Sequence, residues 1–594
     1  MTSLRAWGLP VALWIGFAAP PGAPAFQTMF PAVRGTREMV AAANNFEVEA
    51  GYRLLAAGGN AVDAGVAAVL TAAVTEQSRF GLGGEMPVLV KMSGRDVVAI
   101  SGAGTAPAEA TVEFYRSRPP EPWERSGEMP PIPEAGIRAA VVPGAFDGLI
   151  LALDKFGTKS FAEAAAPAVE YAGGFPLPEE FARFLKRDHE LLALWPASLA
   201  FFYPGGAIPE RGGILRFPDL ARTLTELART EKRTRGSRSK KLKAVRDAFY
   251  RGRIGKRVAT FSQENGGLIT EEDLARFAAE TDAPASISYR DYTVYKPGFW
   301  SQGPVLLQAL AILEGFDLAA MGHNSPEYLH TVVEAMKLAF ADRDRYYGDP
   351  KFSEIPAARL LSKEYAAGRR PLIDAAQASS EHRPGNLLPP LHLSSGGAET
   401  REQPDTTCVN VVDRWRNVFS ATPSGAWLPS VIAGDTGVPL STRLQSFVLT
   451  AGHPNILEPG KRPRITLSPT IVTRDGKPVL ALSTPGGDNQ DQALLQVLLN
   501  ILDFGMTPQE AVEAPRVQSS HFYSSFGLHE FKPAGLAVED RIPDATVAEL
   551  ERRGHRIRVA GAWSNSSAPT VIQIDGEVLH GGADPRRARF IFGR

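Results

Sequence analysis

A Thr-Thr pair stands directly before an apolar, β-branched run in the last third of this chain of 594 residues, at Asp405-Thr406-Thr407-Cys408. The run itself, Val409-Asn410-Val411-Val412, is typical of a buried β-strand. A chain that cuts itself here would expose an N-terminal threonine, which supplies a hydroxyl as nucleophile and an α-amine as the base that activates it. An ordinary strand start has the same pattern, so the rest of the sequence has to decide between the two interpretations.

The sequence around this pair predicts a loop before it and a sheet after it. Residues 369–405 are rich in Pro, Gly, Ser and Glu, which predicts a flexible loop that ends at Asp405-Thr406. Pro485-Gly486-Gly487 opens a predicted helix near 493–502, and a strand-to-helix junction of this kind leaves backbone N–H groups unpaired, as an oxyanion hole requires. Predicted strands lie at 408–413, 417–422, 470–473 and 479–483.

The first half of the chain is predicted to be mainly helical. Residues 45–75 carry small apolar side chains at helical spacing and predict two tightly packed helices broken at Gly58-Gly59. Gly81-Leu82-Gly83-Gly84 predicts a tight turn into a strand at 87–90, and no Gly-Lys-Ser/Thr follows that would make it a phosphate-binding loop. The section from about 140 to 350 is predicted mostly helical, and we interpret His330 within it as structural rather than catalytic.

Composition fits a soluble protein with a large core. Hydrophobic residues make up 44% and charged residues 22% of the chain, and the length favours one or two large, intertwined domains. A net charge of −1 gives no indication of nucleic acid or an acidic membrane surface as a partner. The basic run at 232–241 is broken by Gly and Ser and has no aromatic residue, so we interpret it as solvated and assign it no function.

The N-terminus has the pattern of an export signal. Arg5 precedes an apolar stretch at residues 7–19, and Ala23-Pro24-Ala25 has the small-x-small form of a cleavage site. Residues 1–25 are therefore predicted to be a signal peptide, with a mature periplasmic or secreted chain; a loosely held apolar tail is the alternative. No later run reaches the ~18 apolar residues that span a bilayer. The single cysteine, Cys408, excludes an intramolecular disulfide and a multi-cysteine metal site, and we expect it to serve packing.

Together these segments resemble the γ-glutamyltransferase family of N-terminal nucleophile hydrolases over residues 38–590. The matching motifs before the Thr-Thr pair are Gly58-Gly59-Asn60-Ala61-Val62-Asp63-Ala64, Gly81-Leu82-Gly83-Gly84, Val142-Pro143-Gly144, Gly267-Leu268-Ile269-Thr270, Leu313-Glu314-Gly315-Phe316-Asp317-Leu318 and Ala341-Asp342-Arg343. From the pair onward they are Asp405-Thr406-Thr407, Pro459-Gly460-Lys461-Arg462-Pro463, Ser468-Pro469-Thr470-Ile471-Val472, Pro485-Gly486-Gly487, Asp503-Phe504-Gly505-Met506 and Glu510-Ala511-Val512-Glu513-Ala514-Pro515-Arg516.

The resemblance implies an α+β protein with a four-layer αββα sandwich. It also implies cleavage between Asp405 and Thr406 into a large subunit, 26–405, and a small subunit, 406–594, and attack by the threonine on the carbonyl of a small amide. No metal and no cofactor are expected, and the resemblance is compatible with a homodimer of the processed heterodimer. By position in the motifs, Thr406 corresponds to the nucleophile and Gly486 and Gly487 to the oxyanion hole. Ser424 stands where the family has a second threonine that supports the nucleophile's amine.

The positions that bind a γ-glutamyl group depart from the family pattern. Its arginine for the α-carboxylate falls within Ser101-Gly102-Ala103-Gly104-Thr105, which has no cation, and its paired serines correspond to Ile465-Thr466. Its acidic pair, which holds the α-amino group, corresponds to Gln445-Ser446. A zwitterionic head needs one cation and one anion to offset its desolvation.

The chemistry is thus predicted to be retained and γ-glutamyl recognition to be lost or rebuilt. Arg443 and Arg464, with Thr466 beside the second, are the candidate substrate-binding residues for a carboxylate, and a structural ion pair is the alternative for either arginine. The favoured hypothesis is a threonine amidohydrolase or acyltransferase acting on a small amide that bears a carboxylate. The alternatives are a true glutathione hydrolase with a rearranged pocket and an uncleaved, inactive binding protein with the same fold.

Overall fold

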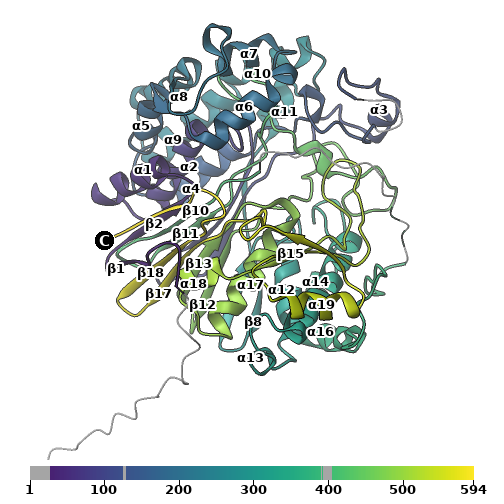
Figure 1. Ribbon diagram of the computed structural model, residues 1–594. Coiled ribbons are helices and arrows are strands. Elements are labelled where there is room, and N and C mark those ends of the chain that lie inside the picture. The colour runs from purple at the N-terminus through teal and green to yellow at the C-terminus, as the bar shows by residue number, and fades with distance from the viewer. Residues whose placement is uncertain (1–26, 125–128, 390, 392, 394–404) are drawn as a thin grey trace, which may run out of the picture.

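The computed structural model describes residues 27–124, 129–389, 391, 393 and 405–594. The predicted signal peptide, 1–25, and residues 394–404 of the predicted loop lie outside them. At the centre, two seven-stranded antiparallel sheets stack face to face (Figure 1). The first sheet contains, in spatial order, β1 (Val33–Gly35), β18 (Val578–Ala583), β17 (Thr570–Asp575), β13 (Lys477–Ser483), β12 (Thr470–Arg474), β9 (Tyr292–Lys296) and β8 (Ala285–Tyr289). The second contains β19 (Phe590–Gly593), β2 (Met39–Ala42), β10 (Val409–Val412), β11 (Val418–Ala421), β3 (Met86–Lys91), β4 (Val97–Gly102) and β7 (Glu280–Asp282).

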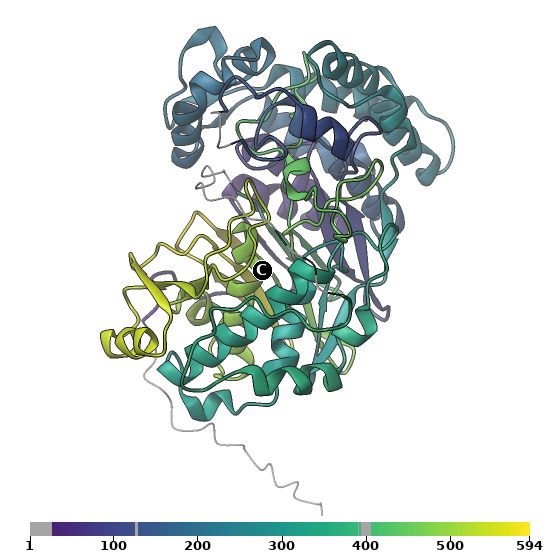
Figure 2. The same cartoon turned by 90° about the vertical axis from the view of Figure 1, so that its right-hand side faces the viewer.

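Helices cover the outer face of each sheet, which completes the predicted αββα sandwich. Figure 2 shows the helices of the first half of the chain at the upper end and the later helices at the lower end. The helices on the second sheet's side are α1 (Asn45–Ala56), α2 (Ala61–Thr75), α4 (Ala145–Phe156), α5 (Phe161–Ala172), α6 (Glu179–Leu192), α7 (Pro196–Phe202), α8 (Pro218–Arg233), α9 (Arg238–Tyr250), α10 (Arg253–Glu264) and α11 (Glu271–Arg276). Those on the first sheet's side are α12 (Pro304–Leu313), α13 (Leu318–Met321), α14 (Pro326–Tyr346), α15 (Ala357–Leu360), α16 (Lys363–Arg369), α17 (Gln490–Leu502), α18 (Pro508–Glu513) and α19 (Asp544–Arg552).

Smaller elements lie around this sandwich. A three-stranded sheet is formed by β14 (Val517–Ser519), β15 (Gly535–Glu539) and β16 (Arg556–Ala560), and a two-stranded one by β5 (Phe175–Pro176) and β6 (Ile214–Leu215). The helix α3 (Val112–Ser117) lies at the periphery (Figure 1). No helix of the described ranges is both long and apolar enough to cross a membrane.

Strand β10, which follows the Thr-Thr pair, lies in the interior of the second sheet. Its side chains alternate, as a strand buried on both faces requires: Val409 and Val411 pack toward the helices, and Val412 packs between the sheets. Between the sheets, the Asn410 side-chain amide donates to Thr570 Oγ1 at 2.9 Å. Each additional buried hydrogen bond of this kind contributes about 1 kcal/mol. The strand is therefore fixed from both sides, and so is the position of the residues just before it.

The structure confirms most of the predicted elements and corrects one. The helices in 45–75, the strands after the Thr-Thr pair and the helix after Gly487 are all present, and the last of these begins at Gln490. The section from 140 to 350 is mostly helical, but it also contains β7, β8 and β9, which form one edge of each central sheet. These strands are short, and β7 and β9 pair with strands that are distant in the sequence, so the helical pattern on either side of them obscured their signal.

Candidate active site

Thr406 lies in the short segment between the loop and β10. The neighbouring Thr407 N–H donates to the Pro423 carbonyl oxygen at 3.0 Å, which ties this segment to the chain beyond β11. This contact brings the Thr406 hydroxyl within 3.0 Å of the Ser424 hydroxyl. Thr406 is only 2% exposed. The two hydroxyls that the sequence singled out, 18 residues apart, thus form one hydrogen-bonded pair.

Ser424 is held in place by the glycine turn at 81–84. Glu85 and Ser424 exchange two backbone hydrogen bonds, each of 2.9 Å. The chains approach so closely that a Cβ atom at Gly84 would lie 2.1 Å from the Ser424 carbonyl oxygen. A side chain at this position is therefore excluded by contact with backbone. Gly84 thus serves the close packing of Ser424, and Gly81 and Gly83 pack closely against Pro439.

Gly486 and Gly487 form the sharp turn between β13 and α17. Their φ angles are +130° and +53°, and the first lies where only glycine is comfortable. The Gly487 N–H donates to Asp405 Oδ1 at 3.2 Å, and the same oxygen accepts from the Thr406 N–H at 2.8 Å. In the intact chain, the Asp405 carboxylate thus occupies the backbone donor that the sequence assigned to an oxyanion hole.

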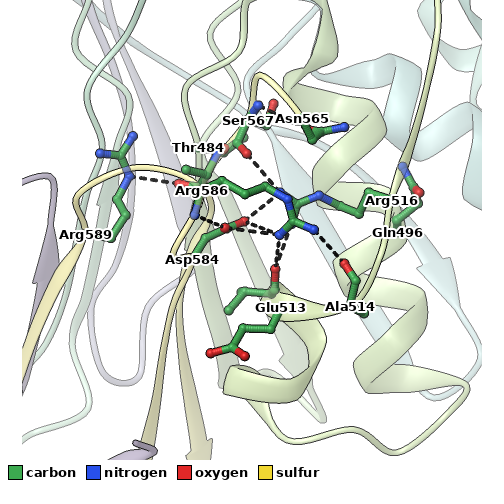
Figure 3. A network of polar contacts seen from close by, with 12 residues as sticks. Thr484, Gln496, Glu513, Ala514, Arg516, Asn565, Ser567, Asp584, Arg586 and Arg589 are labelled. Atoms are coloured by element: carbon green, nitrogen blue, oxygen red, sulfur yellow. Dashed lines mark hydrogen bonds and ion pairs between the residues drawn. The ribbon is translucent and has the colours of Figure 1, made fainter. Parts of the chain in front are cut away.

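A buried ionic network supports this glycine turn from behind (Figure 3). A Cβ atom at Gly486 would lie 2.0 Å from Ser567 Oγ, so Ser567 packs directly on the turn. The Arg516 guanidinium donates to the Ser567 carbonyl oxygen at 2.9 Å and pairs with Asp584 at 2.6 Å. Arg586 pairs with the same Asp584 at 3.1 Å. The geometry of the turn therefore depends on charges that do not line the cavity.

Arg443 is the cation that lies closest to the two hydroxyls. Its Nε donates to the Glu85 carboxylate, and its Nη2 lies 3.4 Å from Ser424 Oγ. The guanidinium is 4.5 Å from the centroid of the Trp427 ring and 5.6 Å from that of Phe526. Burial raises the pKa of Glu85, and Arg443 partly offsets this.

The remaining nitrogen of this guanidinium, Nη1, differs from the other two. Among the described residues, Arg443 Nη1 has no hydrogen-bond partner although it is buried. A buried charged donor without a partner costs free energy, so a carboxylate that reached Nη1 would gain a charge-assisted hydrogen bond.

These groups surround one cavity of about 370 Å³. Thr466 contributes a hydroxyl whose Oγ1 has no partner among the described residues. The cavity is lined by Asp405, Thr406, Trp427, Arg443, Thr466, Gly486, Gly487, Asp488, Asn489, Gln518, Ser520, Phe522, Ser524, Phe526, Glu530, Lys532 and Ser566. The structure thus brings together Thr406, both glycines, Arg443 and Thr466, and Ser424 lies directly behind Thr406.

The carboxylates of this cavity all have a cationic partner. Asp405 lies 3.6 Å from Arg587 Nη1, and Glu530 pairs with Lys532 at 3.1 Å. Asp488 pairs with Arg343 and accepts from the Ser525 hydroxyl at 2.6 Å. A ligand ammonium group would therefore find no unpaired carboxylate among the described lining residues.

Arg464 does not line this cavity. It borders a neighbouring cavity of about 590 Å³, together with His453, His529 and Tyr523. Its Nη2 donates to Ser525 Oγ at 2.8 Å, and its Nη1 lies 3.7 Å from Asp344. Burial, with Arg343 nearby, lowers the pKa of Arg464 to about 10. Arg464 is thus part of a buried ionic cluster that forms the wall between the two cavities.

Two of the positions that depart from the expected family pattern, Ala103 and Ile465, lie in an apolar cluster. Ala103 and Ile465 pack together with Trp300 and Leu467 in a small buried cluster, and none of the four lines the cavity. Gln445 donates to the Glu134 and Thr442 carbonyl oxygens at 3.0 and 3.1 Å. Two sites where the family places polar substrate contacts are therefore part of the core.

Sequence reasoning missed several residues of the site. Glu85, the partner of Arg443, directly follows the glycine turn, and this adjacency was the available signal. Gln490, at the start of α17, places Nε2 3.5 Å from Thr406 Oγ1. Cys408, by contrast, is buried as expected, with Sγ 3.6 Å from Thr570 Oγ1 and a pKa raised by burial. Within the described ranges, no group of three or more His, Cys, Asp and Glu side chains is placed to hold a metal ion.

Comparison with known proteins places the chain in a family. A family model described as gamma-glutamyltranspeptidase matches residues 48–593. The glutathione hydrolase-like YwrD proenzyme of Bacillus subtilis is 34% identical over 565 residues, which cover 94% of this chain and 98% of the relative. The glutathione hydrolase proenzyme of Escherichia coli is 33% identical over 590 residues, covering 96% and 94%.

A solved structure extends the comparison to the fold. The crystal structure of cephalosporin acylase from Bacillus halodurans superimposes with a TM-score of 0.82 at 29% identity, covering 97% of this chain and 99% of that one. The chain therefore belongs to the gamma-glutamyltranspeptidase family of N-terminal nucleophile hydrolases, and it is a proenzyme whose activity is hydrolysis or acyl transfer at an amide bond.

Proposed function

We propose that the chain cleaves itself between Asp405 and Thr406 and that Thr406, as the new N-terminus, is the catalytic nucleophile. The observation that carries this proposal is the pairing of the Thr406 and Ser424 hydroxyls at 3.0 Å, beside a backbone donor at Gly487. In the precursor, Thr406 Oγ attacks the Asp405 carbonyl carbon, the peptide C–N bond breaks, and the resulting ester is hydrolysed. Residues 26–405 then form the large subunit and 406–594 the small one.

In the mature enzyme, the freed α-amine takes the proton of the Thr406 hydroxyl as this attacks the substrate carbonyl. Ser424 holds the hydroxyl and amine in position. The oxyanion of the tetrahedral intermediate accepts from the turn at Gly486 and Gly487, where Asp405 sits in the precursor. Collapse of the intermediate breaks the amide bond, and the amine base returns its proton to the leaving amine. Because threonine supplies nucleophile and base, the reaction needs no metal or cofactor.

The test of the nucleophile is a pair of adjacent threonines. Thr406→Ala removes the attacking hydroxyl, so this variant should remain one polypeptide on a denaturing gel. Thr407→Ala is the matched control, because Thr407 Oγ1 is buried and has no hydrogen-bond partner among the described residues. It should cleave, and N-terminal sequencing of the small fragment should begin at Thr406. A fragment that begins elsewhere, or cleavage of Thr406→Ala, would contradict the assignment.

We further propose that the substrate is an amide of a small acyl group that bears a carboxylate but no α-amino group. Arg443 Nη1 would bind the carboxylate, with the Thr466 hydroxyl as a second donor, and Arg464 would shape the wall behind them. A γ-glutamyl ammonium would enter beside carboxylates that already have cationic partners. Desolvating a poorly paired charge costs several kcal/mol, and each 1.36 kcal/mol is a tenfold change in rate.

Two chromogenic substrates isolate this difference, because glutaryl p-nitroanilide is γ-glutamyl p-nitroanilide without its α-amino group. The ratio of their kcat/KM values should favour the glutaryl compound by at least about 100-fold. Arg443→Gln should remove this activity mainly through KM, whereas the uncharged acetyl p-nitroanilide should lose little. If the γ-glutamyl compound were the better substrate at micromolar KM, the chain would be a true glutathione hydrolase with an ammonium site elsewhere.

We also propose that the mature protein is periplasmic or secreted and starts near Phe26. The support is the pattern of residues 1–25 and the bacterial origin of the relatives. N-terminal sequencing of the large fragment tests the start of the chain. A homodimer of the processed heterodimer remains a proposal that light scattering of the purified enzyme would test.

A further inference from the structure

Three consecutive helices on the outside of the molecule carry a strong local excess of positive charge. Residues 222–257 contain 14 Lys or Arg against three Asp or Glu, although the whole chain has a net charge of −1. This segment extends well beyond the basic run at 232–241. It spans α8, α9 and the first turn of α10, which lie in the upper, outer part of the molecule (Figure 1).

The burial pattern directs this charge outward. Leu224, Leu227 and Val245 face the core, so the apolar side of these helices is already buried. Two of the three acidic residues also face inward or have internal partners. Glu231 is buried and accepts the backbone N–H groups of Phe161 and Ala162 at the start of α5. Asp247 pairs with Arg246 on its own helix.

The cations line two shallow hollows that meet at one arginine. Arg222, Arg229 and Arg233 recur at helical spacing along α8 and line the first hollow with Arg253. Arg253 also lines the second hollow, with Lys256 and Arg257 from the first turns of α10. These six residues are called the basic face below. All six are exposed.

The carboxylates at the basic face offset only part of its charge. Glu226 pairs with Arg253, Asp435 with Arg257, and Asp219 with Arg222. By contrast, Arg229, Arg233 and Lys256 have no acidic partner within the described residues. Three exposed cations are thus held on one surface without counter-ions from the protein.

We propose that the basic face is a docking surface for an anionic lipid bilayer. Basic residues held at the surface of a membrane with anionic headgroups each contribute attraction, and the contributions of several add up to stable peripheral binding. The face is built on helices whose apolar sides are already buried, so it rests on headgroups by charge and inserts no apolar side chain. This docking is independent of the proposed catalytic reaction.

The same surface is less suited to nucleic acid. Single-stranded binding relies on aromatic side chains on which bases stack. Phe217, Phe249 and Tyr250, which lie next to the basic face, are buried, and Phe261, which lines the second hollow, is half-buried, so no fully exposed aromatic ring is offered by these residues. Shallow hollows on the outside of a helical layer also offer no helix or ribbon that could enter a groove.

Vesicle co-sedimentation of the purified, full-length protein tests the proposal. Vesicles of phosphatidylcholine with 30% phosphatidylglycerol should bind the protein at low salt, and pure phosphatidylcholine vesicles should not. Arg229→Glu/Arg233→Glu/Lys256→Glu should weaken binding by at least about 100-fold, since each basic residue at such a surface contributes a factor of about five. Binding of the unaltered protein should vanish near 0.5 M NaCl, where the Debye length is a few ångströms.

The matched control reverses three exposed cations away from this face, Lys477, Arg556 and Arg558. It has the same net charge as the first triple variant and should bind vesicles nearly as well as the unaltered protein. Equal loss in both variants would show that net charge, not this face, governs binding, and would overturn the proposal. So would binding to neutral vesicles, the absence of binding to anionic vesicles, or tighter binding to a duplex oligonucleotide at the same salt. Unchanged turnover of a chromogenic amide shows that both variants are folded.

Discussion

The turn at Gly486 offers the sharpest test of how the site is built. Gly486→Ala adds one carbon atom, which would lie 2.0 Å from Ser567 Oγ and 3.1 Å from Ser567 Cβ. The first distance is too short for a Cβ contact and the second is tight, so either the turn or Ser567 must move. A φ angle of +130° adds backbone strain, of about 1–3 kcal/mol for such outliers. Ser567 itself is restrained, because its Oγ accepts from Asn489 at 3.0 Å and its carbonyl from Arg516.

The glycine turn is therefore the part expected to give way. A shift of its N–H groups by about 1 Å would remove an oxyanion donor, and loss of one donor costs about 10²–10³ in kcat. KM should change little, because the carboxylate contact at Arg443 lies outside the turn. Self-cleavage of the precursor should slow for the same reason.

A second substitution separates steric overlap from backbone strain. Ser567→Gly removes both close atoms, so the double variant Gly486→Ala/Ser567→Gly should regain at least tenfold in kcat over Gly486→Ala. The strain at φ +130° remains and should keep the double variant below the unaltered enzyme. The assay is single-turnover release of p-nitroaniline, with fragment formation followed on gels. Retention of kcat within threefold in Gly486→Ala would refute the placement of the oxyanion hole at this turn.

Three further predictions concern the glycine turn, the partner of Arg443 and the pH dependence of stability. Gly487→Val should abolish turnover while cleavage only slows, because a β-branched residue is strained at φ +53°; full turnover in a p-nitroanilide assay would place the hole elsewhere. Glu85→Gln leaves the buried Arg443 without its anion, so the thermal midpoint should fall, and added glutarate should raise it more than in the unaltered enzyme, as a thermal shift assay would show. Burial lowers the pKa of His555 to about 2, from about 6.5 in an unfolded chain, so its contribution to stability is present above pH 6.5 and is lost as the pH falls. The free energy of unfolding lost in this way is about 2 kcal/mol at pH 5. The thermal midpoint of His555→Gln should therefore fall less between pH 7 and pH 5 than that of the unaltered protein.

The elements of the core were predictable from the sequence because local pattern and tertiary role agree there. Strand β10 carries β-branched side chains on both faces and lies between two layers. Its valines therefore indicate a buried strand. The helices α1 and α2 are separated at Gly58, whose φ of +83° ends the first of them. Strands β8 and β9 were missed because both are short. Strand β9 pairs with β12, about 180 residues away, and β8, at the edge of the sheet, pairs with β9.

The parts of the site that strand ends and turns position were predictable from the sequence, and the contacts between distant side chains were not. Thr406, Ser424 and the two glycines are fixed by strand ends and turns, which motifs specify. The environment of Arg443 depends on Glu85, 358 residues earlier in the chain, and no local pattern encodes that pair. Arg464 and Thr466 are two residues apart, yet they border different cavities, because the wall between them is closed by Asp344 and Ser525 from other segments.

In the proposed function, the retained chemistry and the changed specificity therefore have separate structural causes. The proposed nucleophile, Thr406, and the proposed oxyanion donors are positioned by the backbone of a four-layer frame, and moving them would disturb packing at Gly84, Gly486 and Ser567. The proposed substrate contacts, by contrast, come from the side chains of Arg443 and Thr466. Ala103 and Ile465 lie in a buried apolar cluster, while Arg443 places a cation at the cavity from another segment. A fold of this kind can therefore change the acyl group that it accepts without altering the position of its threonine.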